Sequence, residues 1–328
     1  MMTNLTEPVP VTPVEAHPAL PRFARRKLFM IGSRCGRLAN RMFVFAKFAA
    51  LAEEHGHRLM NVSFHSYSEF FEGTRGNIYC RYPRPERRSW VDVVPGVAAA
   101  LRKLRILYHL TRYTCLLNER FPIFGKAAVT LRELPGCHGT LLDEPEYQEK
   151  IRPAKIVLVY GCWLFTPSLV QKHGQKIRAY FRPVQRFETA GRLAIESLRR
   201  EADLVIGVHV RHGDYRGWKG GKYFFPASRY AAWMHELAAQ FPDRKVAFFV
   251  CSDESRSAGE FPGLTVGFGT DSPVSDVYAL ARCDYILGPK STFSQWASFY
   301  GEKPLFQVGG TGDAARLENF RVSYLDWE

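Results

Sequence analysis

The chain has 328 residues, 46% of them hydrophobic, which is enough for two domains of ordinary size with separate cores. No stretch approaches the roughly 20 uninterrupted apolar residues of a membrane span, and no signal-peptide layout opens the chain, so we expect a cytoplasmic protein. The net charge of +13 is uneven, because residues 1–183 hold 28 Lys and Arg against 14 Asp and Glu, and residues 184–328 hold 17 against 18. The basic half suits an anionic membrane, a lipid-pyrophosphate acceptor or nucleic acid, or is simply a solvated basic face.

The predicted elements begin after a proline-rich leader, residues 1–21, which we expect to be disordered. The run 27–31 predicts a strand, and after a glycine-bearing loop the pattern of 38–55 predicts a helix with one packed face. A further strand is predicted at 58–62. We interpret residues 66–135 as mostly an insertion, with a basic helical stretch over 93–113.

The second half of the chain alternates more regularly. A strand at 156–160 and a helix at 168–181 come before Pro183, so we place a boundary there and expect α/β domains at 22–183 and 184–328. Strands are then predicted at 204–210, 246–250, 285–287 and 304–308, and helices at 193–200, 227–240, 274–282 and 292–300. This alternation indicates a parallel sheet covered on both faces, in which ligands bind beyond the carboxyl ends of the strands.

Residues 208–215 read Val-His-Val-Arg-His-Gly-Asp-Tyr and pass from a predicted strand into a loop at that ligand-binding end. Arg211 can give forked, charge-assisted hydrogen bonds to phosphate oxygens, and Gly213 lets the backbone approach closely. A purely structural ion pair between Arg211 and Asp214 is the other open interpretation.

Residues 290–296 read Lys-Ser-Thr-Phe-Ser-Gln-Trp and open a predicted helix directly after a strand. Hydroxyls, backbone amides and the positive end of the helix dipole converge at such a place, which suits a pyrophosphate. Plain N-capping by Ser291 or Thr292 explains the same residues. The glycine-bearing turn at 36–43 is a weaker signal, because a turn that only connects a strand to a helix looks alike.

We expect neither a metal nor a cofactor. His209 and His212 lie three positions apart but lack a third ligand of suitable spacing. The chain contains no Asp-x-Asp pair, which nucleotide-sugar enzymes use to hold a divalent ion. The seven cysteines are scattered and never form the close pairs of zinc sites, so we expect most of them to be buried thiols in a reducing compartment.

Taken in order, four segments resemble the fucosyltransferase superfamily, most closely the bacterial α-1,2-fucosyltransferase type. Residues 36–43 are similar to its Gly-x-Leu-Gly-Asn-Gln-x-Phe segment, and 160–181 to its strand, aromatic loop and Ile-Arg-x-x-Phe helix. Residues 208–215 resemble its His-x-Arg-Arg-x-Asp-Tyr motif, followed at 248–253 by a strand ending in Ser-Asp. Residues 276–296 resemble its Asp-x-Tyr helix, strand and Ser-Thr-Phe-Ser-x-Trp block. The four segments in this order are a far more specific sign of the family than any one of them alone.

The resemblance implies an α/β fold of the GT-B type, with two Rossmann-like domains and a cleft between them. It also implies an inverting, metal-independent glycosyltransferase that moves fucose from GDP-fucose to a glycan or lipid-linked acceptor. By position, Arg211 grips the β-phosphate and stabilises the charge on the departing GDP. The other donor positions are His209 and Asp276 for guanine and ribose, Ser294 and Gln295 for the pyrophosphate, and the neighbouring hydroxyls Ser291 and Thr292. Gly36, Asn40 and Arg41 line the cleft on the acceptor side.

The chain departs from the family pattern at three positions, which limits how far the family's residue roles apply to it. His212 replaces the second arginine of the motif, Ala39 replaces a glycine and Arg41 replaces a glutamine. We expect His212 to be a weaker or pH-dependent phosphate contact. Asp214 is the candidate general base, although it could instead orient Arg211. A transferase for another nucleotide sugar, an inactive binding member of the family and, from a different class, a basic nucleic-acid-binding protein are the alternatives.

Overall fold

The computed structural model describes residues 26–87, 89–94, 96–132, 140–141, 145–162, 164–165, 167–270 and 272–325. The leader expected at 1–21 lies outside these residues. The chain forms two compact units, an N-terminal unit that extends to Glu188 and a C-terminal unit that runs from Thr189 to Ser323.

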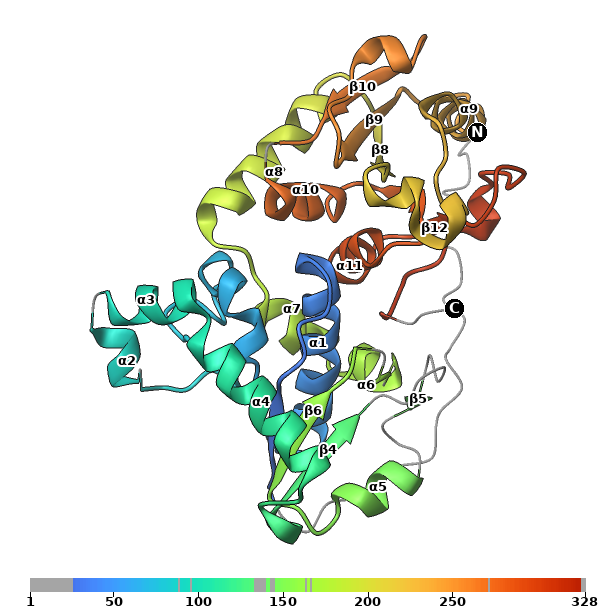
Figure 1. Cartoon of the computed structure of the whole chain (residues 1–328). Helices are drawn as coiled ribbons and strands as arrows, with labels where there is room; N and C mark the ends of the chain where they lie inside the picture. Colours follow the sequence, from blue (N-terminus) through green and yellow to red (C-terminus); the bar gives the residue numbers. More distant parts are fainter. Residues whose placement is uncertain are drawn as a thin grey trace. The chain divides into compact units, whose positions relative to one another are not determined.

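The N-terminal unit is built on a five-stranded sheet in the order β3-β2-β1-β6-β4. Figure 1 labels β4 and β6 of this sheet, beside helix α4. Its strands are β1 (Leu28–Ile31), β2 (Arg58–Met60), β3 (Arg81–Tyr82), β4 (Ala128–Arg132) and β6 (Ile156–Tyr160). All neighbours are parallel except β2 and β3, which pair antiparallel at the edge. A separate pair joins β5 (Thr140–Leu141) to β7 (Leu164–Phe165).

Helix α1 (Leu38–His55) is the central helix of this unit and has the predicted bounds. It ends at Gly56, whose φ of 65° is the left-handed conformation that terminates many helices. The Phe45 ring packs edge-on against the rings of Phe64 and Phe181. Phe64 lies in η1 (Val62–Phe70), and Phe181 directly follows α7 (Gly174–Tyr180). The remaining helices here are α5 (Pro145–Ile151) and α6 (Pro167–Lys172).

The basic stretch expected to be helical over 93–113 is helical, but it is divided. Three helices occupy this region: α2 (Trp90–Val93), α3 (Val97–Leu104) and α4 (Ile106–Arg120). Gly96, with φ 83°, separates the first two, and Arg105, with φ 54°, separates the last two. A residue in the left-handed region cannot continue a right-handed helix, so the helical pattern is interrupted at both places.

The C-terminal unit carries a second five-stranded sheet, entirely parallel, in the order β10-β9-β8-β11-β12. Its strands are β8 (Leu204–Val210), β9 (Val246–Ser252), β10 (Thr265–Phe268), β11 (Tyr285–Pro289) and β12 (Leu305–Val308). Its helices are α8 (Gln185–Arg199), which begins at the end of the N-terminal unit, α9 (Ala227–Ala238), α10 (Pro273–Leu280) and α11 (Thr292–Gly301). Strand β8 is central and every one of its residues is buried.

Helices cover both faces of this second sheet. Ile206 and Val208 of β8 pack in one core with Trp233 and Leu237 of α9. On the opposite face, a Cβ on Gly207 would lie 2.7 Å from a methyl of Leu280, so α10 sits directly on the strand. The α/β fold with two Rossmann-like sheets is thereby confirmed.

The cysteines follow the expectation only in part. Cys80, Cys115, Cys251 and Cys283 are buried thiols. Cys35 and Cys162, however, form a disulfide, because they follow the neighbouring parallel strands β1 and β6, whose carboxyl ends lie side by side. A separation of 127 residues concealed this pair in the sequence.

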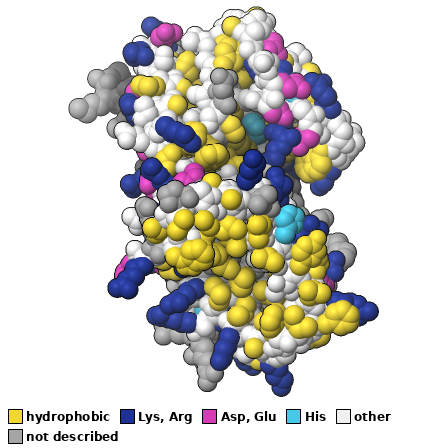
Figure 2. All heavy atoms as spheres, turned by 60° about the vertical axis from the view of Figure 1, so that its left-hand side comes forward, with side chains coloured by type: hydrophobic (Ala, Val, Ile, Leu, Met, Phe, Trp, Pro, Cys, Tyr) yellow, Lys and Arg dark blue, Asp and Glu magenta, His cyan; other side chains and the backbone are white. Residues whose placement is uncertain are grey.

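Large apolar side chains are exposed on one side of the N-terminal unit. Figure 2 turns this side forward, and its lower body shows a broad hydrophobic area with Lys and Arg around the margins. Ten exposed members lie between Trp90 and Phe124, on α2, α4 and the loop that follows: Trp90, Val93, Val94, Ile106, Leu110, Tyr113, Leu117, Phe121, Ile123 and Phe124. Among the described residues, none of the helices has the length and apolar character needed to cross a membrane.

Candidate functional site

The carboxyl edge of the C-terminal sheet gathers the charged residues of three neighbouring strands. Arg211 follows β8, Asp253 follows β9, and Lys290 follows β11. The Tyr215 hydroxyl donates a hydrogen bond of 2.6 Å to the Lys290 carbonyl, which ties the loop after β8 to the loop before α11. The sheet therefore places residues from distant parts of the sequence at one edge, as parallel strands do.

Arg211 lies between two carboxylates. Its Nη2 is 2.7 Å from Asp214 Oδ1 and its Nη1 is 3.3 Å from Asp253 Oδ2. The Arg211 side chain is 17% exposed and the Asp214 side chain 53%. The ion pair with Asp214 that the sequence left open is thus formed, and Asp253 is a second partner that sequence reasoning did not include among the site residues.

Asp253 also holds the backbone of the loop after β8. The His212 amide donates to Asp253 Oδ1 at 2.9 Å, and a Cβ on Gly213 would lie only 2.4 Å from Asp253 Oδ2. Burial raises the pKa of Asp253, but the His212 amide and the Arg211 charge outweigh it, so the pKa lies below its ordinary value. Asp253 is therefore an ionised carboxylate that fixes both the Arg211 side chain and the loop that carries it.

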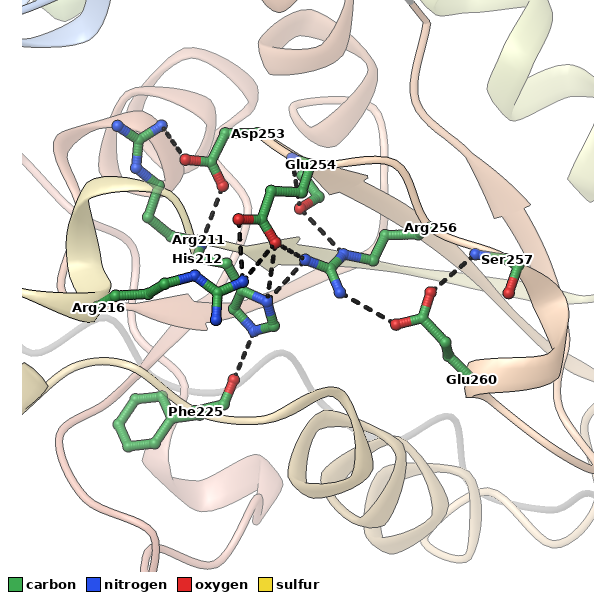
Figure 3. A network of polar contacts seen from close by, with 10 residues as sticks. Arg211, His212, Arg216, Phe225, Asp253, Glu254, Arg256, Ser257 and Glu260 are labelled. Carbon is green, nitrogen blue, oxygen red and sulfur yellow. Dashed lines mark hydrogen bonds and ion pairs between the residues drawn. The ribbon is translucent and has the colours of Figure 1, made fainter.

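The His212 ring points into a second network of polar contacts, shown in Figure 3. Its Nε2 is 2.6 Å from the Phe225 carbonyl, which only accepts, so Nε2 carries the hydrogen. Its Nδ1 accepts from Arg256 Nη2 at 2.6 Å. Both ring nitrogens of His212 therefore have partners within the protein, and the phosphate contact expected of this residue stays a prediction.

Arg256 is the centre of this second network and was missed in the sequence. Its side chain is 8% exposed, and its Nη2 and Nη1 contact Glu254 and Glu260 at 2.9 and 3.0 Å. Glu254 also pairs with Arg216 at 2.9 Å, and the Arg216 contact is the main reason why the pKa of Glu254 lies below its ordinary value. Glu254 and Glu260 are near Arg256 in the sequence, but His212 lies 44 residues away, and that distant contact has no mark in the sequence.

His209 is buried at the end of β8 and its ring packs on Phe293 of α11, with centroids 4.9 Å apart. Burial, and secondarily the Arg211 charge, lowers the pKa of His209 to about 3, so the imidazole is neutral near pH 7. Its Nδ1 has no hydrogen-bond partner among the described residues. Across those residues, no group of three or more His, Cys, Asp and Glu side chains forms a metal cluster.

The hydroxyl run at the start of α11 has capping contacts. Ser291 is the N-cap, and its hydroxyl accepts from the Phe293 amide at 3.2 Å. Ser294 is fully buried and its hydroxyl donates to the Ser291 carbonyl at 3.1 Å. Gln295 donates to Gln307 of β12 at 3.2 Å, and Thr292 is also buried. The simpler interpretation, N-capping, is therefore realised by Ser291.

Asp276 lies in the first turn of α10, the helix that follows strand β10. Its Oδ1 accepts from the Thr270 amide at 2.6 Å and from the Thr270 hydroxyl at 3.0 Å. A Cβ on Gly269 would lie 2.8 Å from Asp276 Oδ2, so the loop closes tightly on the carboxylate. Asp276 therefore shapes the β10–α10 loop.

The N-terminal candidates lie at the turn between β1 and α1. Gly36 has φ 50°, and a Cβ there would lie 2.1 Å from Asn40 Nδ2, so this position needs glycine. Arg41 is buried, and it donates to the Gly36 carbonyl at 3.2 Å and to the Ser66 hydroxyl at 2.9 Å. Burial lowers the pKa of Arg41 from its ordinary value. Its guanidinium therefore supports the turn from inside.

Known proteins resemble this chain in part of its sequence and in its fold. No family model matches it. Nodulation protein Z of Azorhizobium caulinodans is 29% identical over a match that covers 31% of this chain and 40% of that protein. The chain thus matches less than half the length of this relative.

Two solved structures extend the comparison. FUT1 of Arabidopsis thaliana, solved as an Arg-to-Lys mutant in complex with GDP, is 15% identical in sequence to this chain. The match covers 90% of this chain and 74% of FUT1, with a TM-score of 0.52. Fucosyltransferase NodZ from Bradyrhizobium is 16% identical, and the match covers 88% of this chain and 98% of NodZ, with a TM-score of 0.47. At these identities, the likeness to FUT1 establishes a GT-B-like fold.

Proposed function

We propose that the chain is an inverting, metal-independent glycosyltransferase that moves fucose from GDP-fucose to a glycan or lipid-linked sugar. The observation that carries the proposal is Arg211, held by two carboxylates at the carboxyl edge of a parallel Rossmann-like sheet. The ordered fucosyltransferase motifs, the partial match to nodulation protein Z and the fold shared with FUT1, solved in complex with GDP, support it.

In the proposed reaction an acceptor hydroxyl attacks the anomeric carbon of fucose from the face opposite the GDP. The bond from that carbon to the β-phosphate oxygen breaks, and its electron pair leaves with GDP. Arg211 offers two charge-assisted hydrogen bonds to the oxygens on which negative charge grows. Because Asp253 and Asp214 already orient the guanidinium, little reorganisation is needed when charge develops.

Asp214 is the proposed general base. Its carboxylate is half exposed, so an acceptor hydroxyl can reach it, and Arg211 orients one of its oxygens. A proton passes from the acceptor to this carboxylate as the new bond forms. If Asp214 only positions Arg211, its replacement by Asn should raise KM for the donor more than it lowers kcat.

The remaining donor contacts are proposed at the same edge of the sheet. Neutral His209, with its unpartnered Nδ1, suits a base edge, and the first-turn amides of α11 suit the pyrophosphate. Ser291, Thr292, Ser294 and Gln295, all in or next to this first turn, are proposed to line the pyrophosphate site. Asp276 is proposed for the ribose.

The acceptor side is proposed at the β1–α1 turn, where Gly36 and Asn40 come close together. Arg41 would act there through the turn it supports. Peripheral contact of the basic N-terminal half with an anionic membrane belongs to the same proposal, since it would bring the enzyme to a lipid-linked acceptor.

Calorimetric titration with GDP, GDP-fucose and UDP in the presence of a chelator tests the donor site. We expect guanine-selective binding that persists in chelator and falls at least about 100-fold in Arg211→Ala, since a charge-assisted bidentate contact contributes roughly 3 kcal/mol. Arg192→Ala is the matched control, because Arg192 is an exposed arginine paired with Glu196 on α8. Equal binding of UDP would indicate another nucleotide sugar, and binding of RNA but no nucleotide would favour the nucleic-acid alternative.

A further inference from the structure

Helix α4 is amphipathic in the opposite sense to an ordinary surface helix. The residues that it buries are Tyr108, Thr111, Cys115 and Asn118, three of them polar or small. The residues that it exposes are Ile106, Leu110, Tyr113 and Leu117, which recur at spacings of four, three and four and so form one stripe along the helix. Leu110 is 60% exposed and Leu117 is 52% exposed. A surface helix normally presents its polar side to water, so this stripe requires an explanation.

The polar side of α4 is firmly held against the sheet, so the helix cannot turn its apolar stripe inward. Asn118 Nδ2 donates to the Ala128 carbonyl at 3.3 Å and to the Thr130 hydroxyl at 3.2 Å, both on β4. A Cβ on Gly32, just after β1, would lie 2.6 Å from Cys115 Sγ, so the helix approaches the strand end closely. A rotation that buried Leu110 would break these contacts and leave Asn118 without its partners.

Further exposed apolar side chains lie before and after α4 in the sequence. The loop after the helix exposes Phe121, Ile123 and Phe124, α2 exposes Trp90 and Val93, and Val94 follows α2. Trp90, at 72%, is the most exposed large apolar side chain among the described residues. Helix α2 is fixed by Val91, which packs with Ile78 and Ala98. We call these ten exposed apolar residues of 90–124 the α2–α4 face.

Positive charge surrounds the α2–α4 face. Residues 87–126 contain eight Lys and Arg but only two Asp and Glu. Lys103, Arg105, Arg120 and Lys126 are exposed, and the Arg120 guanidinium lies 5.2 Å from the centroid of the Phe121 ring. Aromatic and aliphatic side chains beside Lys and Arg are the composition of segments that lie in the interface of an anionic membrane.

We propose that the α2–α4 face docks on an anionic lipid surface, with its apolar side chains in the interfacial layer and its basic residues against the lipid phosphates. A second copy of the chain is a poorer occupant, because two such faces would bring like charges together. The inference rests on the membrane contact named under the proposed function and assigns it to particular residues, and vesicle binding tests it separately from transfer of fucose.

Flotation of the full chain with two kinds of vesicle tests this surface. We expect the protein to float with vesicles of phosphatidylcholine and phosphatidylglycerol at low salt, and much less with phosphatidylcholine alone or at high salt, which screens the charges. Replacing two leucines of the stripe, Leu110→Gln with Leu117→Gln, should lower the partition constant on the order of tenfold. Arg120→Gln with Lys126→Gln should lower it about fivefold for each charge removed.

Matched controls come from the C-terminal unit. Leu193→Gln replaces a leucine of α8 that is 53% exposed, and Arg200→Gln replaces an exposed arginine that directly follows the last residue of α8. Both should bind vesicles as the unaltered chain does, and circular dichroism with urea titration should show that every variant is folded. The proposal is wrong if the unaltered chain ignores anionic vesicles or if the leucine variant binds them equally well. It is also wrong if sedimentation shows a dimer that the leucine variant loses while no vesicle is bound.

Discussion

At the carboxyl edge of the C-terminal sheet, Arg211 and Arg256 each contact two carboxylates and are largely buried, whereas around the α2–α4 face Lys103 and Lys126 are exposed beside apolar side chains. In the first region the protein supplies the counter-charges and fixes the position of each guanidinium. In the second region, the positive charges and apolar side chains face outward together. Under the two proposals, the first arrangement, with Arg211 already held in place, suits a small anionic ligand, and the second suits a large anionic surface.

The largest effect on stability is expected where a charge in the paired network is removed. Arg256→Ala leaves Glu254, Glu260 and His212 Nδ1 without a shared donor, and should lower the free energy of unfolding by roughly 2 kcal/mol, since its carboxylate partners are partly exposed. Lys126→Ala, at the margin of the α2–α4 face, should change it by less than about 0.5 kcal/mol. Urea titration of both variants measures the contrast, and equal losses would contradict it.

Adjacent residues of α4 sharpen the comparison between inner and outer sides of one helix. Asn118→Ala removes hydrogen bonds to β4 and should cost about 1 to 2 kcal/mol, because the Thr130 hydroxyl and the Ala128 carbonyl lose a buried partner. Leu117→Gln should cost no more than about 0.5 kcal/mol, because this leucine is already in water. A larger loss for Leu117→Gln, measured by urea titration, would mean that the stripe is covered within the molecule.

The smallest expected effect is a pH dependence that belongs to Asp253. Its pKa is lower in the folded chain than in the unfolded chain, so its contribution to stability is complete above the ordinary carboxyl pKa of about 4 and is lost as the pH falls through the lowered value. Asp253→Asn should therefore be less stable than the unaltered chain near pH 7 by about 1 kcal/mol, and the two should converge at acid pH. Melting temperatures across this range provide the measurement, and a constant difference would exclude the linkage.

Much of the fold could be predicted because its signals are local. The bounds of α1, β6 and β8 follow from the 3.6-residue period of one packed face and from short runs of buried apolar residues. Strand β10 was missed because it is a short edge strand without a buried run. The break between α3 and α4 was not predicted because the left-handed conformation of Arg105, an ordinary helix former, leaves no mark in the sequence.

By itself the sequence determined the alternation of strands and helices, the arginine at the end of β8, and the excess of positive charge in the first half. Each of these depends on neighbouring residues or on a sum over residues. Only the tertiary structure decided that Asp253 and Arg256 join the network, that Cys35 bonds to Cys162, and that α4 turns its leucines outward. Those outcomes depend on which strand ends lie side by side and on which helix face finds partners in the sheet, and residues distant in the chain decide both.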